Sequence, residues 1–150
     1  MKAFFVTERL AFGSSITTWR HVEQLQELGI THIINLRRST NNKKIRRFRW
    51  LWLPFKDDKK RRPRWFYRRA LKFHRRATQK RNSKVFVMCH HGICRSASLV
   101  YFLLRAQGIG TPRAELIVRQ ARQRVQIARA YRESGEQYLR CSKRQSIQEE

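Results

Sequence analysis

The chain has 150 residues, of which 35 are Lys or Arg and 10 are Asp or Glu, so its formal net charge is +25. This length suits a single domain, residues 1–150, with its own core, and the hydrophobic fraction of 41% argues against disorder. Three cysteines are too few for a disulfide framework, and no apolar run is long enough to span a membrane. We therefore expect an intracellular monomer, cytoplasmic or nuclear, whose partners are polyanions.

In the first half of the chain, short apolar runs alternate with an amphipathic segment. Residues 4–12 predict one or two strands, and residues 31–36 predict a buried strand. Between them, residues 17–28 predict a helix, because apolar residues recur at intervals of three. The expected buried face of this helix carries Trp19, Val22, Leu25 and Leu28. A polar loop at 39–44 precedes a further predicted strand at 48–55.

In the second half, helices predominate. Residues 63–80 have helical periodicity, with basic residues toward water and a predicted apolar face of Phe66, Ala70, Phe73 and Ala77. Residues 85–88 predict a strand, and residues 96–106 predict the helix after it. Two more helices are expected at 111–130 and 131–143, and then a frayed tail at 145–150. Alternation of strands and helices favours an α/β fold with a central, mostly parallel sheet flanked by helices.

The segment that joins the strand at 85–88 to the next helix contains Cys89 and Arg95. A loop at a helix N-terminus directs several backbone N–H groups to one point, where the helix dipole also favours negative charge. The same field favours the thiolate form of Cys89, which is a nucleophile. The guanidinium of Arg95 offers a planar fork of donors that matches two phosphoryl oxygens. The pair therefore predicts a phosphoryl-transfer site.

Neighbouring residues fit the same chemistry. Gly92 allows a tight turn that brings the amides of residues 90–95 onto a phosphate, and Ser96 can donate to the sulfur of Cys89. The expected substrate-binding residues are His90, His91, Gly92, Ile93 and Cys94. The alternative for Cys89 is a buried structural thiol. Cys94 is expected to pack as a small apolar residue, with a regulatory disulfide to Cys89 as the alternative.

His90 and His91 have three interpretations. They can line the mouth of the pocket, lie exposed on the loop, or join Cys89 and Cys94 as metal ligands. The spacing of the two cysteines with adjacent histidines is not a standard zinc pattern, so the metal interpretation is the weakest. No metal and no cofactor are expected.

The run from Cys89 to Ser96 resembles the Cys-x5-Arg-Ser/Thr loop of the cysteine-dependent protein phosphatases, and the dual-specificity branch is the best match. Residues 11–14 and 27–36 are similar to flanking segments of that family, and the resemblance extends from about residue 4 to about residue 140. The sequence departs from the family at Met88, where a histidine is usual. The resemblance implies the dual-specificity phosphatase fold and hydrolysis of phosphomonoesters through a cysteinyl-phosphate.

The resemblance also implies an aspartate upstream of the cysteine that protonates the leaving group. Asp57 best matches the family's position, and Asp58 is the second choice; no other aspartate is present. The alternative is that both are solvated loop carboxylates.

The basic stretch from Lys59 to Arg64 is expected to select acidic or multiply phosphorylated substrates, with phosphoproteins ahead of phosphoinositides and RNA 5′-phosphates. A different hypothesis is a nucleic-acid-binding module on a phosphatase scaffold. It draws on aromatic residues among the basic ones, most of which we expect in the core: Phe48, Trp50, Trp52, Trp65, Phe66 and Tyr67. Nonspecific nucleic-acid binding is therefore a second expected interaction.

Overall fold

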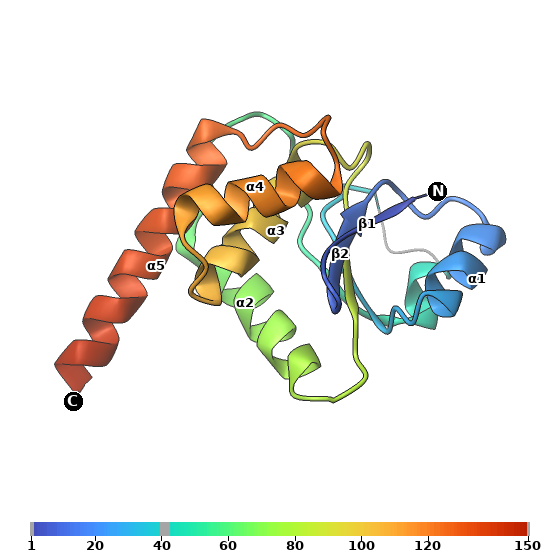
Figure 1. Ribbon diagram of the computed structural model, residues 1–150, viewed down its shortest axis with the longest axis horizontal. Coiled ribbons are helices and arrows are strands. Elements are labelled where there is room, and N and C mark those ends of the chain that lie inside the picture. Colours follow the sequence, from blue (N-terminus) through green and yellow to red (C-terminus); the bar gives the residue numbers. More distant parts are fainter. Residues whose placement is uncertain (1, 40–42, 150) are drawn as a thin grey trace.

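The computed structural model describes residues 2–39 and 43–149, which form one α/β domain (Figure 1). Its five-stranded sheet has the order β1-β2-β5-β3-β4. The strands are β1 (Ala3–Thr7), β2 (Leu10–Gly13), β3 (His32–Asn35), β4 (Arg49–Trp52) and β5 (Val85–Met88). Strands β2, β5, β3 and β4 are parallel, and β1 pairs with β2 in the antiparallel direction. The expected mostly parallel sheet is confirmed.

Helices cover both faces of this sheet (Figure 1). They are α1 (Trp19–Glu27), α2 (Arg64–Thr78), α3 (Arg95–Ala106), α4 (Thr111–Ala121) and α5 (Arg129–Glu149), with a short 3-10 helix η1 (Ile45–Arg47). One face is covered by α2, α3, α4 and α5, and the opposite face by α1. None of these described helices is long and apolar enough to cross a membrane.

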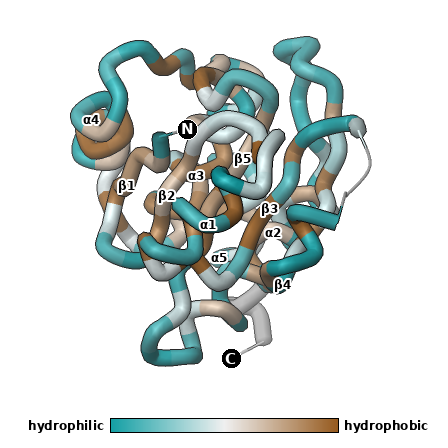
Figure 2. Tube along the Cα trace, turned by 90° about the vertical axis from the view of Figure 1, so that its right-hand side faces the viewer, coloured by the Kyte–Doolittle hydropathy of each residue, from teal (hydrophilic) through white to brown (hydrophobic). Residues whose placement is uncertain are grey.

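The central strand β5 contributes to two separate hydrophobic cores. Side chains of a strand point alternately to the two faces of a sheet. Val85 and Val87 accordingly pack in the core under α2 to α5, whereas Phe86 and Met88 pack in the core under α1. All four residues are fully buried, and hydrophobic segments follow the strands inside the molecule (Figure 2). This burial on both faces holds the carboxyl end of β5 in place.

Helix α1 buries fewer residues than expected. Val22 and Leu25 are buried, but Trp19 and Leu28 are 47% and 43% exposed. Residues spaced by three drift by about 60° around a helix at each step, so only the middle of such a series shares one face. The Trp19 ring instead lies 5.4 Å from the ammonium of Lys44 and 5.5 Å from the guanidinium of Arg47.

The prediction of a helix at 111–130 is wrong for the second half of that segment. Helix α4 ends at Ala121, residues 122–128 form a loop, and α5 begins at Arg129. The loop turns back to the segment after β5, where Arg122 Nη1 donates to the carbonyl of Gly92 at 2.9 Å and the Gln126 N–H donates to that of Ile93. Val125 is buried at the same place. These contacts compensate for the helical hydrogen bonds that the break removes.

Helix α5 continues through residue 149, beyond the end expected at 143, so the helical backbone includes most of the segment that the sequence indicated as a frayed tail. The strand expected at 48–55 is shorter, and β4 covers only Arg49–Trp52. Three positions of the polar loop at 39–44, residues 40–42, lie outside the described residues.

Candidate active site

A loop between β5 and α3 carries Cys89 and ends at Arg95, the first residue of α3. Gly92 gives this loop its sharp turn, with a φ of +68° that L side chains rarely adopt. A Cβ atom at Gly92 would lie 2.5 Å from the carbonyl carbon of Gly13, at the end of β2. The loop is therefore packed against the neighbouring strand at a distance that only glycine allows.

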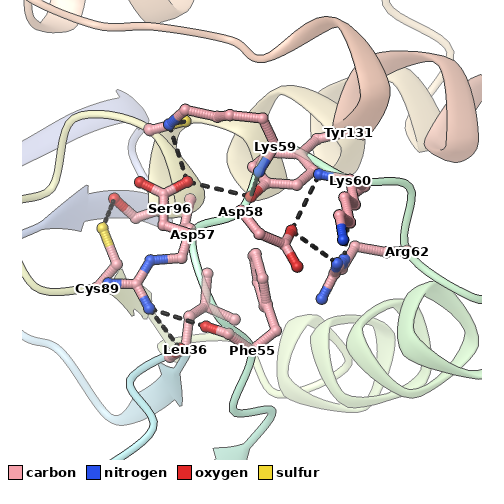
Figure 3. A network of polar contacts seen from close by, with 12 residues as sticks. Leu36, Phe55, Asp57, Asp58, Lys59, Lys60, Arg62, Cys89, Ser96 and Tyr131 are labelled. Carbon is pink, nitrogen blue, oxygen red and sulfur yellow. Dashed lines mark hydrogen bonds and ion pairs between the residues drawn. The ribbon is translucent and has the colours of Figure 1, made fainter.

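Cys89 lies at the base of this loop and is 2% exposed. Its Sγ atom accepts from the Gly92 N–H at 3.2 Å and is hydrogen-bonded to the Ser96 hydroxyl at 3.2 Å (Figure 3). Once the thiol has lost its proton, the hydroxyl can only act as the donor of that second bond. A backbone N–H and a hydroxyl therefore contact the sulfur beside the N-terminal end of α3.

The guanidinium of Arg95 is held from one side by backbone carbonyls. Its Nη1 donates to the carbonyl of Phe55 at 2.9 Å and to that of Leu36 at 3.3 Å. Among the described residues, Nε and Nη2 have no acceptor, and Arg95 lines the same pocket as Cys89. The unoccupied edge of the fork is thus available to phosphoryl oxygens.

Asp57 lines this pocket as well, on the loop between β4 and α2. Its Oδ1 accepts from the Lys59 ammonium at 2.8 Å and from the Tyr131 hydroxyl at 3.0 Å (Figure 3). Partial burial raises the pKa of the Asp57 carboxyl, but these two hydrogen bonds and the charges of Lys59 and Arg95 outweigh burial and lower it. Burial raises the pKa of Tyr131 to about 12, so this residue stays a neutral donor.

Asp58 does not line the pocket and has a different surrounding (Figure 3). Its Oδ1 accepts from the Lys60 N–H at 2.9 Å and from Arg62 Nη2 at 3.0 Å. The backbone hydrogen bond and the charge of Arg62 lower the pKa of Asp58. Asp58 therefore orders the loop, and of the two aspartates only Asp57 lies with Cys89 and Arg95.

The pocket has a volume of about 350 Å³ and includes part of the predicted substrate-binding set. His91, Ile93 and Cys94 line it. His90 does not; it is exposed, and its ring lies edge-on to that of His91, with centroids 4.3 Å apart. No group of three or more His, Cys, Asp or Glu side chains suited to a metal ion occurs among residues 2–39 and 43–149.

Cys94 contacts the side chain of Lys59. The Lys59 Nζ donates to Cys94 Sγ at 3.0 Å, and the thiol is nearly buried. Burial raises the pKa of the Cys94 thiol in spite of the lysine's hydrogen bond, so this cysteine is neutral, unlike the nucleophile expected at Cys89. Cys94 was expected to pack as a small apolar residue; it belongs to the core cluster under α2 to α5, but its sulfur also accepts from Lys59 and lines the pocket.

Four residues of the site were missed by sequence reasoning. Three of them lie in the loop after α4 and one lies in α5: Arg124, Val125, Gln126 and Tyr131. Lys59 was expected as part of the basic stretch that selects substrates, but not as the partner of Asp57. Residues 122–128 contain no Gly, Pro, Asn or Asp, so no local turn signal marks the break in the helix. Lys59 has a φ of 60°, which the sequence does not indicate either.

Comparison with known proteins places the chain in a family. The sequence profile described as "Dual specificity phosphatase, catalytic domain" matches residues 12–135. The chain therefore belongs to the dual-specificity phosphatase family and is a cysteine-dependent phosphatase. A search of curated proteins finds no significant match.

Solved structures share the fold at low sequence identity. The structure of PTPMT1 has a TM-score of 0.82 at 14% identity, covering 98% of this chain and 99% of that chain. Human DUSP28 has a TM-score of 0.78 at 20% identity, covering 93% and 97%. A mouse putative dual specificity phosphatase complexed with zinc tungstate has a TM-score of 0.80 at 23% identity, covering 97% and 91%.

Proposed function

We propose that the chain hydrolyses phosphomonoesters with Cys89 as nucleophile and Asp57 as general acid. One observation carries this proposal: the Cys89 sulfur, hydrogen-bonded by Gly92 and Ser96, lies in one pocket with Arg95 and Asp57. The sulfur forms a bond to phosphorus while the bond from phosphorus to the leaving oxygen breaks. The loop amides and the Arg95 fork stabilise the charge on the equatorial oxygens.

Asp57 supplies the proton that the leaving oxygen needs in the first step. In the second step its carboxylate accepts a proton from the attacking water, the sulfur–phosphorus bond breaks, and inorganic phosphate forms. The Ser96 hydroxyl then donates to the departing thiolate of Cys89. Because Lys59 keeps the pKa of Asp57 low in the free enzyme, we infer that a bound phosphate dianion restores the protonated carboxyl by its opposing charge.

The preferred substrates are phosphoproteins in which acidic or further phosphorylated residues flank the phosphate. Within the basic stretch from Lys59 to Arg64, Arg61 and Arg62 are already ion-paired with Glu133 and Asp58. Lys59, although itself paired with Asp57, and the exposed Arg124 both line the pocket, so these two cations lie nearest to additional negative charge on a bound substrate.

Phosphoinositides and RNA 5′-phosphates are the competing substrates. The structure of PTPMT1 in complex with PI(5)P has the same fold, with a TM-score of 0.79 at 14% identity. A panel of phosphopeptides, phosphoinositides and RNA 5′ ends separates the three classes, with wild type and Cys89→Ser compared on each. We expect phosphopeptides to have the highest kcat/KM and Cys89→Ser to hydrolyse nothing. Equal p-nitrophenyl phosphate hydrolysis by both proteins would contradict the mechanism.

A further inference from the structure

Helix α2, which packs against α3 and α5 (Figure 1), has one face in the core and an opposite face made almost entirely of cations. Its buried residues are Phe66, Tyr67, Ala70, Leu71, His74 and Ala77. Its exposed charged residues are Arg64, Arg68, Arg69, Lys72, Arg75 and Arg76, which we call the α2 cationic face. None of these six residues lines the catalytic pocket. The face is therefore a surface separate from the active site.

Within the described part of the chain, no carboxylate is paired with the α2 cationic face. The helix contains no Asp or Glu, and none of the six cations takes part in an ion pair among the described residues. The few acidic side chains of the C-terminal region are paired with other arginines, as in Arg105–Glu136, Arg119–Glu115 and Arg129–Glu133. Six cations without an ion pair among the described residues thus lie together on one face of α2.

The like charges of the α2 cationic face destabilise the helix that carries them. Like charges at positions i and i+4 destabilise a helix, and the row Arg64, Arg68, Lys72 and Arg76 repeats that spacing three times. Core packing of the other face compensates for the repulsion. A polyanion bound along the row would remove it, because each cation would then face a negative group.

The positive surface continues from α2 onto the edge of the sheet. The ring of His32 in β3 lies 5.6 Å from that of Phe73 in α2, and His32 is paired in register with Arg49 of β4. Paired residues of neighbouring parallel strands point to the same face of the sheet. The exposed Arg49 therefore lies on the α2 side, and its charge acts on His32 together with that of Lys80, beyond the end of α2.

We propose that the α2 cationic face binds the phosphodiester backbone of double-stranded nucleic acid without sequence preference. Five of the six cations are arginines, whose planar fork matches phosphate oxygens. Along the helix axis, α2 rises by about 18 Å from Arg64 to Arg76, at 1.5 Å per residue. This length is enough to contact several successive phosphates of a duplex.

Two features favour a duplex over other polyanions. The apolar face of α2 is buried in the core and Trp65 is its only exposed large hydrophobic residue, so the helix has no apolar surface to insert into a lipid bilayer. Single strands are bound by series of exposed aromatic rings, and Trp65 alone does not make such a series. A row of regularly spaced cations without neighbouring exposed aromatic rings is suited to a double-stranded backbone.

The test compares two triple variants that lose the same charge. Arg68→Gln/Lys72→Gln/Arg76→Gln removes part of the α2 cationic face. Arg20→Gln/Arg113→Gln/Arg140→Gln removes three exposed arginines from α1, α4 and α5. Binding of a labelled duplex, as RNA and as DNA, is measured by anisotropy over a range of salt concentrations, with vesicles containing phosphatidylserine as the competing probe.

We expect wild type to bind both duplexes and the α2 variant to bind at least about tenfold more weakly. Its plot of log affinity against log salt should flatten by up to about 2.7, since each lost phosphate contact contributes about 0.9 to the slope. The control should stay within about threefold of wild type. Equal weakening of both variants, no duplex binding by wild type at low salt, or binding to vesicles alone would overturn the proposal. Thermal unfolding checks the fold: loss of repulsion should leave the Tm of the α2 variant equal or higher.

Discussion

The ammonium of Lys59 lies 2.8 Å from the carboxylate of Asp57, so the proposed proton donor is ion-paired in the free enzyme. The same Nζ also donates to the Cys94 sulfur at 3.0 Å. Lys59 thereby connects the loop between β4 and α2, which carries Asp57, to the loop between β5 and α3, which carries Cys94. We therefore expect Lys59 to be a positioning residue that lowers the pKa of Asp57.

Removing this ammonium should extend activity toward higher pH. Asp57 must be protonated to act as an acid, and its pKa is lowered in wild type although partial burial acts in the opposite direction. Lys59→Gln should raise this pKa, so the descending limb of kcat/KM against pH should move to higher pH. Lys60→Gln is the control, because the hydrogen bonds of Lys60 to Asp58 and Arg62 are made by its backbone, which the substitution keeps. An unchanged limb in Lys59→Gln would contradict the role of Lys59.

The loss of activity on replacing Asp57 should depend on the leaving group of the substrate, and replacing Asp58 should cause little loss. Asp57→Asn should lower kcat by about 10²- to 10⁴-fold on phenyl phosphate, the usual contribution of a general acid. The loss should be smaller on p-nitrophenyl phosphate, whose leaving group needs little protonation. Asp58→Asn should keep most activity on both substrates, because Asp58 contacts Lys60 and Arg62 rather than the pocket. Steady-state kinetics on the two esters test this, and the reverse ranking would assign the acid to Asp58.

Ser96 should matter mainly for the second chemical step. Its hydroxyl lies 3.2 Å from Cys89 Sγ, and a hydrogen bond to a charged group is worth about 1.5–3 kcal/mol. Ser96→Ala should therefore slow breakdown of the cysteinyl-phosphate by about 10- to 100-fold, which stopped-flow would detect as a burst of p-nitrophenol. Ser98→Ala is a matched control, since the buried Ser98 hydroxyl has no partner among the described residues. A burst in both variants would point to a general disturbance of α3.

Alanine substitutions at three glycines should distinguish the cost of backbone strain from the cost of a steric clash. Gly92 combines a positive φ with a carbon atom 2.5 Å from the added Cβ, Gly108 has a φ of +93° and open space, and Gly110 has open space alone. Alanine should lower the free energy of unfolding most at Gly92, by about 1–2 kcal/mol at Gly108, and hardly at all at Gly110. Urea unfolding of the three variants measures this order. Equal losses at Gly92 and Gly108 would mean that the loop moves freely away from Gly13.

Helix α4 and the loop after it are where sequence reasoning about the fold was weakest. Thr111 and Pro112 correctly predicted the start of the helix, because capping and φ restriction are local properties. The helix ends at Ala121, although the residues that follow have no helix-breaking character. The end depends on Arg122 and Gln126 reaching carbonyls about 30 residues earlier in the chain. No pattern of local periodicity contains that information.

The phosphatase class and the strand–loop–helix segment that carries Cys89, Gly92, Arg95 and Ser96 could be predicted from the sequence. These residues lie within eight positions, so a tight turn and a helix N-terminus are enough to bring them together. The groups that surround Asp57 could not be predicted, because they come together only when distant segments pack in the folded chain. Lys59, Tyr131 and Arg124 approach the pocket from segments far apart in the chain. They meet there because α5 packs against α2 and α3, and the loop before α5 is hydrogen-bonded to the loop after β5.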